Sequence, residues 1–345
     1  MAQLPALTGI RALAALWVVS FHFTRFDAHL YNAGFLNPIV RHGYLGVDLF
    51  FVLSGFIMTH VYRGQFRSRL SASSWCDFLQ NRLARLYPIH LVTALAMVAV
   101  AITGRRYGFV PLKASFSPLS LLANITLTQA WFCGVASMNS VAWSISAEWF
   151  AYLLFPMVYF LLWKPGDGWP WVVAPLALGG CLFVGQASPL LRISAEFPLG
   201  MAVYELQTRL PRPLFGRVGG LLGVVALIVT AYCLHDTHYF FGMALASALL
   251  LTALVNPSDL LGWLLSTKAM IYLGEISYSI YMCHWVVWTV LRRGLSVVLE
   301  VKVVPRLWIM LVALSVTLAI SSLLYHVIEL PGRRAIRDLR WRGAW

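Results

Sequence analysis

Arg11 and His22 are two ionisable residues inside an otherwise apolar stretch near the start of the chain. Ten residues lie between them, and only Ser20 among these is polar. Eleven helical positions amount to three turns and about 20°, so both side chains share one face, about 16 Å apart along the axis. A guanidinium can hold an anion, and a neutral imidazole can act as a general base. Alternatively, Arg11 anchors the helix at the membrane surface and His22 is a hydrogen-bonded interior histidine.

Two carboxylates occur in other apolar segments, where we expect them at about the depth of His22. Asp48 lies near the outer end of "GYLGVDLFFVLSGF", and Glu148 lies one turn from Ser144 and Tyr152 in "WSISAEWFAYLLFP". Ionisable groups inside a membrane are costly and therefore indicate function. We expect Asp48 or Glu148 to orient the catalytic imidazole. The alternatives are a helix-capping role for Asp48 and a structural role for Glu148.

The segment "YLGEISYSIYMCHW" carries Glu275 and His284, which are nine positions apart and therefore face opposite sides of a helix. His284 shares its face with Tyr281, and we expect both in the outer half of the membrane. Glu275 is expected near the inner end, where it pairs helices. We expect four side chains to contact a substrate: His284, Tyr281, Tyr152 and Trp143.

Arg82 and Arg85 are three residues apart, immediately before Tyr87 and Pro88 in "FLQNRLARLYPIH". Paired guanidinium groups at the lip of a membrane span can clamp a phosphate; a positive-inside charge bias is the alternative explanation. We expect these arginines and Arg11 on the cytoplasmic side, and the histidines and carboxylates on the outer side. This separation suits a long anionic cosubstrate whose reactive end reaches outward.

The composition places these residues in a membrane protein. Of 345 residues, 60% are hydrophobic and 11% are charged, whereas soluble domains carry about 25% charged residues. Runs of about 20 apolar residues, enough to cross a bilayer, recur along the chain and predict an all-α polytopic protein with about ten transmembrane helices. Residues 118–132 are too short and predict a re-entrant or interfacial segment. The predicted spans are 5–25, 44–63, 82–103, 141–163, 169–187, 190–207, 217–235, 238–255, 268–291 and 304–329.

The net charge of +13 fits contact with anionic lipid headgroups rather than with nucleic acid. The densest basic clusters place both termini in the cytoplasm. No cleavage site follows the first apolar run, so we expect it to be retained. The five cysteines have no C-x-x-C spacing, which argues against a metal site. We expect one transmembrane domain over residues 1–345 and no soluble extracytoplasmic domain.

The order of these motifs resembles the acyltransferase-3 type of membrane enzyme, whose members O-acetylate bacterial surface and exported polysaccharides. The likeness covers nearly the whole chain and is greatest to exopolysaccharide acetyltransferases of the succinoglycan type. It implies that His22 is the catalytic histidine and that Arg11, Arg82 and Arg85 contact acetyl-CoA. The motifs that carry it are Arg-x10-His, "GVDLFFVLSGF", Arg-x-x-Arg before "LYP", "WSISAEWFAYLLFP", "LGEISYSIYMCHW" and "YHVIELPGRR".

The expected activity is transfer of an acetyl group, or another acyl group, from cytoplasmic acetyl-CoA to a sugar hydroxyl without a metal. The expected acceptor is a polysaccharide or a lipid-linked oligosaccharide at the bacterial inner membrane. His22 either removes the proton of the attacking hydroxyl or is itself acetylated first, and the sequence leaves both routes open. The alternatives are a transporter or flippase for lipid-linked saccharides, which often has paired half-repeats, and a non-catalytic membrane subunit. We find no such repeats.

Overall fold

The computed structural model describes residues 4–25, 37–106, 116–132, 135–162, 168–183, 188–210, 216–234, 238–298 and 306–339. Over these ranges the chain is helical and contains no strand, which confirms the predicted all-α fold class. Six helical stretches are long and apolar enough to cross a membrane, so the predicted number of about ten spans is not confirmed. These six are Pro5–Thr24, Gly43–Arg67, Ala72–Arg106, Trp143–Leu162, Gly216–Cys233 and Leu307–Asp338.

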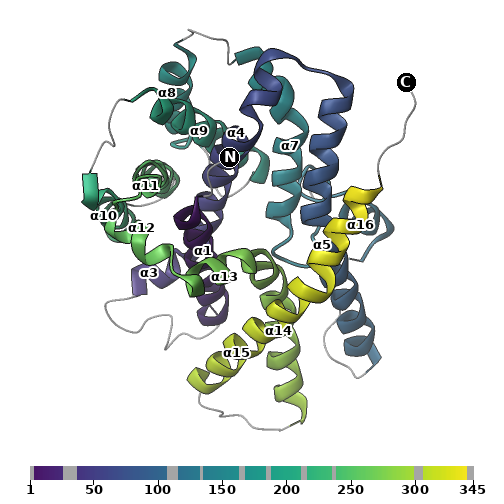
Figure 1. Cartoon of the computed structure of the whole chain (residues 1–345). Coiled ribbons are helices and arrows are strands. Elements are labelled where there is room, and N and C mark those ends of the chain that lie inside the picture. The colour runs from purple at the N-terminus through teal and green to yellow at the C-terminus, as the bar shows by residue number, and fades with distance from the viewer. Residues whose placement is uncertain are drawn as a thin grey trace. The chain divides into compact units, whose positions relative to one another are not determined.

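The chain divides into two compact units (Figure 1). Unit 1 comprises Met1–Leu70 and Leu154–Ser277, and unit 2 comprises Ser71–Leu153 and Tyr278–Trp345. The helix α7 (Trp143–Leu162) contributes residues to both. The other helices of unit 1 are α1 (Pro5–Thr24), α3 (Asn37–Arg41), η1 (Gly43–Leu45), α4 (Gly46–Ser68), α8 (Trp169–Gly180), α9 (Pro189–Arg209), η2 (Gly216–Val218), α10 (Gly219–Cys233), α11 (His238–Leu254), α12 (Leu260–Leu265) and α13 (Lys268–Glu275).

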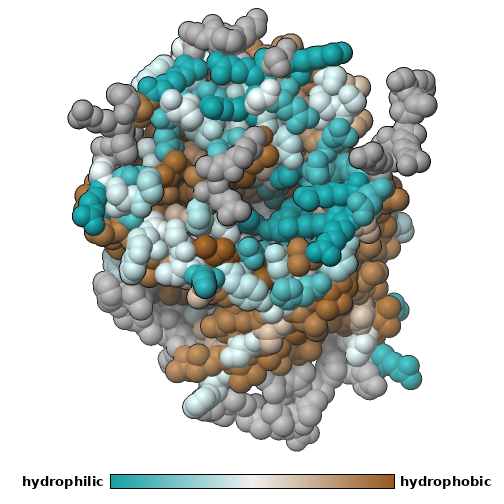
Figure 2. All heavy atoms as spheres, in the orientation of Figure 1, coloured by the Kyte–Doolittle hydropathy of each residue, from teal (hydrophilic) through white to brown (hydrophobic). Residues whose placement is uncertain are grey.

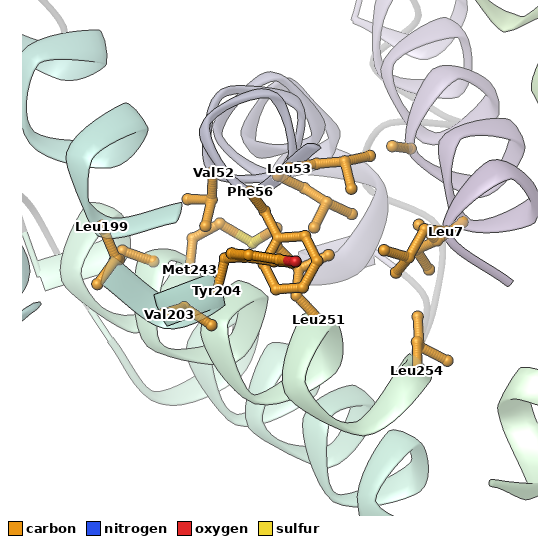
Figure 3. Close-up of a cluster of buried hydrophobic side chains, with 14 of the residues drawn as sticks. Leu7, Val52, Leu53, Phe56, Leu199, Val203, Tyr204, Met243, Leu251 and Leu254 are labelled. Atoms are coloured by element: carbon orange, nitrogen blue, oxygen red, sulfur yellow. The ribbon is translucent and has the colours of Figure 1, made fainter. Parts of the chain in front are cut away.

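The core of unit 1 forms where α4 and α9 cross at two glycines. A Cβ atom at Gly55 would lie 2.0 Å from the carbonyl oxygen of Phe197, and one at Gly200 would lie 1.9 Å from that of Val52. Small residues allow such close contact between helix backbones within a membrane. Apolar side chains from α1, α4, α9 and α11 fill the space beside this crossing, with Phe56 near its centre (Figure 3).

Glycines also fix α1 within unit 1. Near the start of α1, the carbonyl oxygen of Thr8 would lie 1.9 Å from a Cβ atom at Gly274 of α13. Further along, the carbonyl oxygen of Ala14 would lie 2.8 Å from a Cβ atom at Gly46 of α4. The helix that carries Arg11 is therefore held by direct backbone contact on two sides.

Unit 2 is built on α5 and on the C-terminal helices. Its elements besides α7 are α5 (Ala72–Arg106), α6 (Pro118–Ile125), α14 (Ser277–Val298), α15 (Arg306–Leu324), the π-helical turn η3 (Tyr325–Glu329) and α16 (Leu330–Asp338). In Figure 2 the surface over α14 and α15 is mostly hydrophobic, whereas hydrophilic residues gather over α16. The eight residues of α6 are too few to cross a bilayer, as predicted for residues 118–132.

Three predicted spans have different bounds in the structure. The span predicted to begin at residue 82 begins at Ala72, because the polar first turns of α5 are held by α16: Gln80 donates to the carbonyl oxygens of Ile336 and Leu339 at 2.6 and 2.5 Å. The span predicted over 268–291 is interrupted at Ile276 between α13 and α14. The last span continues beyond residue 329 through η3 into α16.

Candidate functional site

His22 lies near the end of α1 and is held by that helix's own backbone. Its Nδ1 atom is 3.0 Å from the carbonyl oxygen of Val18. A carbonyl oxygen can only accept, so Nδ1 carries the hydrogen and the neutral ring has its lone pair on Nε2. The side chain is partly exposed. The imidazole therefore has a defined tautomer with Nε2 as the basic atom, which is what a general base requires.

Arg11 lies on the same uninterrupted helix as His22, so the helical register predicted for the pair is confirmed. Its side chain is partly buried and already has a partner in the structure. Arg11 lies between the positions where α13 and α4 touch α1. It thus belongs to the packed middle of unit 1 rather than to a frayed helix end.

Asp48 is fully buried, and its carboxylate binds Arg192 of α9. Arg192 donates from Nη2 to Oδ2 at 2.6 Å and from Nε to Oδ1 at 3.3 Å. The guanidinium also lies over the ring of Phe240, 4.9 Å from its centroid. Both carboxylate oxygens of Asp48 thus accept from Arg192, a partner that the sequence did not predict, and a role of Asp48 in orienting His22 stays a prediction.

The packing of α4 against α1 gives the level of Asp48 along α1. A Cβ atom at Gly43 would meet the carbonyl oxygen of Trp17, and one at Gly46 would meet that of Ala14. Going from Gly43 to Gly46, the contacted residue on α1 changes from Trp17 to Ala14. The two chain segments therefore run antiparallel there. Asp48 follows Gly46 and thus lies near the level of Ala14, about 12 Å along the axis from His22.

Glu148 lies in unit 2, one turn from Tyr152 on α7. Tyr152 donates a hydrogen bond to the carboxylate of Glu148. The guanidinium carbon of Arg82 lies 6.0 Å from the ring centroid of Tyr152 and 5.9 Å from that of Phe78. The predicted separation in depth between Glu148 and the arginines is therefore wrong: α5 begins at Ala72, which places Arg82 about 15 Å inside the helix.

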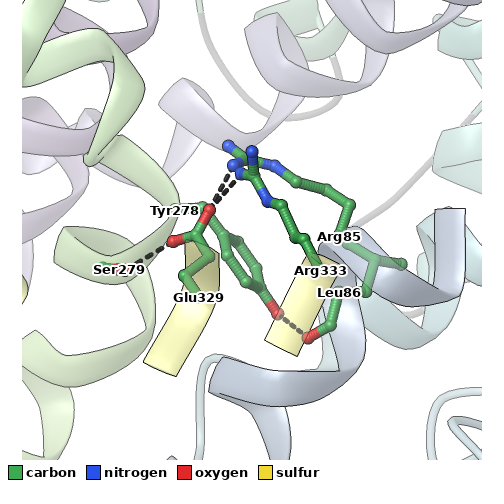
Figure 4. A network of polar contacts seen from close by, with 6 residues as sticks. All are labelled: Arg85, Leu86, Tyr278, Ser279, Glu329 and Arg333. Carbon is green, nitrogen blue, oxygen red and sulfur yellow. Dashed lines mark hydrogen bonds and ion pairs between the residues drawn. The ribbon is translucent and has the colours of Figure 1, made fainter. Parts of the chain in front are cut away.

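Arg85 belongs to a buried ion cluster around Glu329, which Figure 4 shows. The same carboxylate oxygen, Oε1, accepts from both Arg85 and Arg333, and Oε2 accepts from Ser279 at 2.7 Å. The guanidinium carbon of Arg85 also lies 5.4 Å from the ring centroid of Tyr278. One fully buried carboxylate thus joins α5, α14 and α16 and fixes the position of Arg85.

The residues expected to contact the acceptor differ in their surroundings. His284 is fully buried, and its Nδ1–H donates to the carbonyl oxygen of Tyr281 at 2.6 Å. The Tyr281 hydroxyl donates to the carbonyl oxygen of Val141 at 2.9 Å and lies 2.7 Å from the hydroxyl of Ser144. Trp143 is partly exposed, whereas Tyr152 is buried. The packing of His284 and Tyr281 is that of core residues.

Four charged residues of these clusters were not singled out from the sequence. Arg192 and Glu196 are four residues apart inside the predicted span 190–207, and Glu329 and Arg333 are four residues apart at the end of the last span. Opposite charges four apart in an apolar segment share a helix face and should have been noted. Among the described residues, no group of three or more His, Cys, Asp or Glu side chains could hold a metal ion.

Comparison with known proteins places the chain in a reaction class. A family profile described as an acyltransferase domain matches residues 4–326. "Acyltransferase MdmB" of Streptomyces mycarofaciens is 30% identical to the chain over 97% of this chain and 92% of that protein. No solved structure matches the chain.

Two further relatives are longer than the chain. "Putative O-acetyltransferase SAR0937" of Staphylococcus aureus (strain MRSA252) is 21% identical over all of this chain and 60% of that protein. "Putative peptidoglycan O-acetyltransferase YrhL" of Bacillus subtilis (strain 168) is 26% identical over 96% of this chain and 55% of that protein. The chain thus spans somewhat more than half the length of each of these two relatives.

Proposed function

The chain belongs to this family of membrane acyltransferases, and from that premise we propose that it moves an acetyl group from acetyl-CoA to a saccharide hydroxyl. The proposed acceptor is an exported or surface polysaccharide or its lipid-linked precursor. The proposed location is the bacterial cytoplasmic membrane, with both termini cytoplasmic and residues 1–345 forming a single transmembrane domain. Membership of an acyltransferase family argues against the alternative of a transporter for lipid-linked saccharides.

The hydrogen bond between His22 and Val18 is the observation that carries the proposal, because it assigns the hydrogen to Nδ1 and leaves Nε2 as the basic atom. The Nε2 atom takes the proton of the acceptor hydroxyl while the hydroxyl oxygen attacks the thioester carbonyl carbon. The resulting tetrahedral intermediate expels the CoA thiolate, which receives the proton from the imidazolium. The hydrogen bond from Nδ1 to Val18 holds the ring throughout. Acetylation of His22 as a first step is the other route, and it uses the same atom as nucleophile.

The two carboxylates have different proposed roles. Asp48 acts through the fold, because its carboxylate neutralises Arg192. Glu148 keeps its proposed place in the catalytic machinery, because its carboxylate accepts from Tyr152 beside Arg82. A carboxylate in that position can stabilise a developing positive charge on a neighbouring group.

The donor is proposed to contact Arg11, Arg82 and Arg85. The guanidinium of Arg85 is held in position by Glu329 and by the ring of Tyr278. The proposal for the acceptor is supported by the name of the Bacillus subtilis relative, which specifies a polysaccharide. His284, Tyr281, Tyr152 and Trp143 remain the proposed acceptor contacts, with the partly exposed Trp143 the best placed for direct contact.

The test is consumption of acetyl-CoA by the purified full chain in detergent, with and without an acceptor saccharide. Release of the free thiol and incorporation of labelled acetyl into the saccharide are measured together. His22→Ala is expected to lower the rate by about 10²- to 10⁴-fold, without recovery at high acetyl-CoA concentration. The control is His238→Ala, which changes an exposed histidine at the start of α11.

Two results would contradict the proposal. A folded wild-type protein that consumes no thioester with any saccharide tested, but exchanges labelled saccharide across a vesicle membrane, is a transporter. Near-normal turnover by the His22→Ala variant removes His22 from the mechanism, whatever the reaction is.

A further inference from the structure

Unit 1 contains a second group of arginines, at the ends of α4 and α9 and away from His22. Arg63 and Arg67 are four residues apart in the last turns of α4, so they lie on the same face of that helix. Arg209 is the last residue of α9. We call these three residues the arginine cluster of unit 1.

The cluster is gathered around one buried carboxylate. Glu205, 2% exposed, accepts a hydrogen bond from the hydroxyl of Tyr159 at 2.7 Å. Its other oxygen, Oε2, lies 4.0 Å from the Nη2 atom of Arg209. Arg63 and Arg67 lie within electrostatic range of the same Tyr159 hydroxyl. All three arginines therefore surround the Tyr159–Glu205 pair.

Aromatic side chains hold Arg63 in place. Its guanidinium carbon lies 5.3 Å from the ring centroid of Tyr204. That ring packs edge-on against Phe56, as Figure 3 shows from the core side, and its hydroxyl lies 3.2 Å from Nδ1 of His60. A positive-inside bias requires only that arginines occur near a membrane end. Here one of them is fixed over a ring that the core itself holds, so its position is defined before any ligand arrives.

The charges do not balance among the described residues. Three guanidinium groups surround the single carboxylate of Glu205, and neither Arg63 nor Arg67 forms an ion pair with another described residue. Arg67 and Arg209 are exposed. Guanidinium groups with spare positive charge favour the oxyanion of a phosphate, which they can bind through paired hydrogen bonds.

We propose that the arginine cluster of unit 1 is a binding site for a phosphate ester. Two molecules carry this chemistry to a membrane surface: the nucleotide end of acetyl-CoA and the headgroup of an anionic phospholipid. If the ligand is acetyl-CoA, the inference rests on the proposed function. It then extends that function by assigning the donor's phosphates to Arg63, Arg67 and Arg209. The site is additional to Arg82 and Arg85, which belong to unit 2.

The experiment measures binding and does not depend on turnover. Adenosine 3′,5′-bisphosphate, which represents the nucleotide end of acetyl-CoA, is titrated calorimetrically into the purified full chain in a neutral detergent. The variants are Arg63→Gln and Arg67→Gln, and the control is Arg217→Gln, which changes an exposed arginine of η2 outside the cluster. Loss of one charge-assisted contact is expected to raise the Kd about tenfold or more, whereas the control leaves it unchanged.

A second arm tests the lipid source. Each protein is placed in nanodiscs of phosphatidylcholine with or without phosphatidylglycerol, and retained phosphatidylglycerol is counted by native mass spectrometry. If the headgroup is the ligand, Arg63→Gln and Arg67→Gln reduce retained phosphatidylglycerol and leave bisphosphate binding unchanged. If the nucleotide is the ligand, both variants also raise the KM for acetyl-CoA but not for S-acetylpantetheine, which lacks the phosphates of the nucleotide end.

The proposal is overturned if both folded variants bind the bisphosphate and retain phosphatidylglycerol like the wild type. Melting temperatures establish folding, and the exposed Arg67 provides a test that does not disturb Tyr204. Failure of the proposed function can be distinguished from failure of this inference. A wild-type protein that binds the bisphosphate through Arg63 and still consumes no acetyl-CoA contradicts the proposed reaction and leaves the binding site in place.

Discussion

Each unit buries an ion cluster, and the two clusters have opposite compositions. In unit 1, Arg192 binds Asp48, and a second buried carboxylate, Glu196, follows one turn later on the same helix. In unit 2, Glu329 binds two arginines, Arg85 and Arg333. The first cluster has more carboxylates than guanidinium groups, whereas the second has more guanidinium groups than carboxylates.

The clusters also differ in their access to solvent. The side chain of Arg192 is 6% exposed, whereas those of Arg85 and Arg333 are 18% and 19% exposed. A closed cluster without spare positive charge can only hold helices together. A partly open cluster with a spare guanidinium can also receive an anion. The comparison therefore predicts a structural role for the Asp48–Arg192 cluster and a binding role, in addition to a structural one, for the Glu329 cluster.

The largest effect is expected from Asp48→Asn, which leaves the guanidinium of Arg192 buried without its charge partner. Removing one member of a buried ion pair costs about 3–5 kcal/mol. The measurement is thermal unfolding in detergent, followed by the fluorescence of the intrinsic tryptophans. The double variant Asp48→Asn with Arg192→Gln should recover part of the loss, because the buried guanidinium that lost its partner is then removed as well. A double variant as unstable as the single one contradicts the structural role.

A smaller loss of stability is expected from Glu329→Gln. Arg85 and Arg333 can turn toward solvent when the carboxylate charge is gone, so the cost is about that of hydrogen bonds to charged groups, 1.5–3 kcal/mol. The KM for acetyl-CoA should rise as well, because Arg85 is no longer held in position. If Glu329→Gln lowers the melting temperature and leaves the KM unchanged, the clusters do not differ in the way proposed.

Arg82→Lys is expected to change donor binding and leave stability almost unaffected. Lysine keeps the positive charge but loses the planar group that lies over Tyr152 and Phe78. It also loses the second hydrogen bond that the guanidinium can give to a phosphate, worth about 0.5–1.5 kcal/mol, which corresponds to a KM for acetyl-CoA that is a few times higher. The kcat should be retained, and saturating acetyl-CoA should restore the rate. A lower kcat at unchanged KM would assign Arg82 to the reacting centre.

The smallest effect is expected from Glu275→Gln, which changes an exposed residue at the end of α13. Exposed substitutions usually alter stability by less than about 0.5 kcal/mol. Glu148→Gln is the variant for comparison. It is expected to lose activity, because the carboxylate that it changes accepts a hydrogen bond from Tyr152. Initial rates at saturating acetyl-CoA compare the two. Equal losses in both variants would mean that Glu148 has no special role.

The parts of the fold that follow from local composition were predictable. The apolar stretches gave helices, and the joint register of Arg11 and His22 follows from helical geometry alone. The bounds of α5 were not predictable in this way, because its first turns are polar and are held by Gln80 against α16. That contact joins residues more than 250 positions apart, and no local pattern specifies it.

Residues of the candidate site could be proposed one by one from the sequence, but the contacts between them could not. Asp48 and Glu148 are buried or partly buried polar residues; Arg192 binds Asp48 and Tyr152 donates to Glu148, and neither of these contacts was predicted. The sequence predicts the depth of a residue only from its position within its own span. How far α4 is displaced along α1, and therefore which residues of the two helices lie side by side, depends on tertiary contacts that no local pattern specifies.

The π-helical turn η3 has a consequence for the phase of the last helix. Its five residues, Tyr325–Glu329, follow a wider spiral than an α-helix, so they contain in effect one inserted residue. The wider turn absorbs this extra residue, so deleting one residue within it, such as Val327, would restore regular winding and leave the residues after it facing nearly the same way. The same deletion in the regular part of α15 would rotate everything after it by about 100° around the axis and turn Glu329 and Arg333 together away from Arg85. The π-helical turn is therefore the place in this helix where the chain can lose a residue and keep its ion cluster.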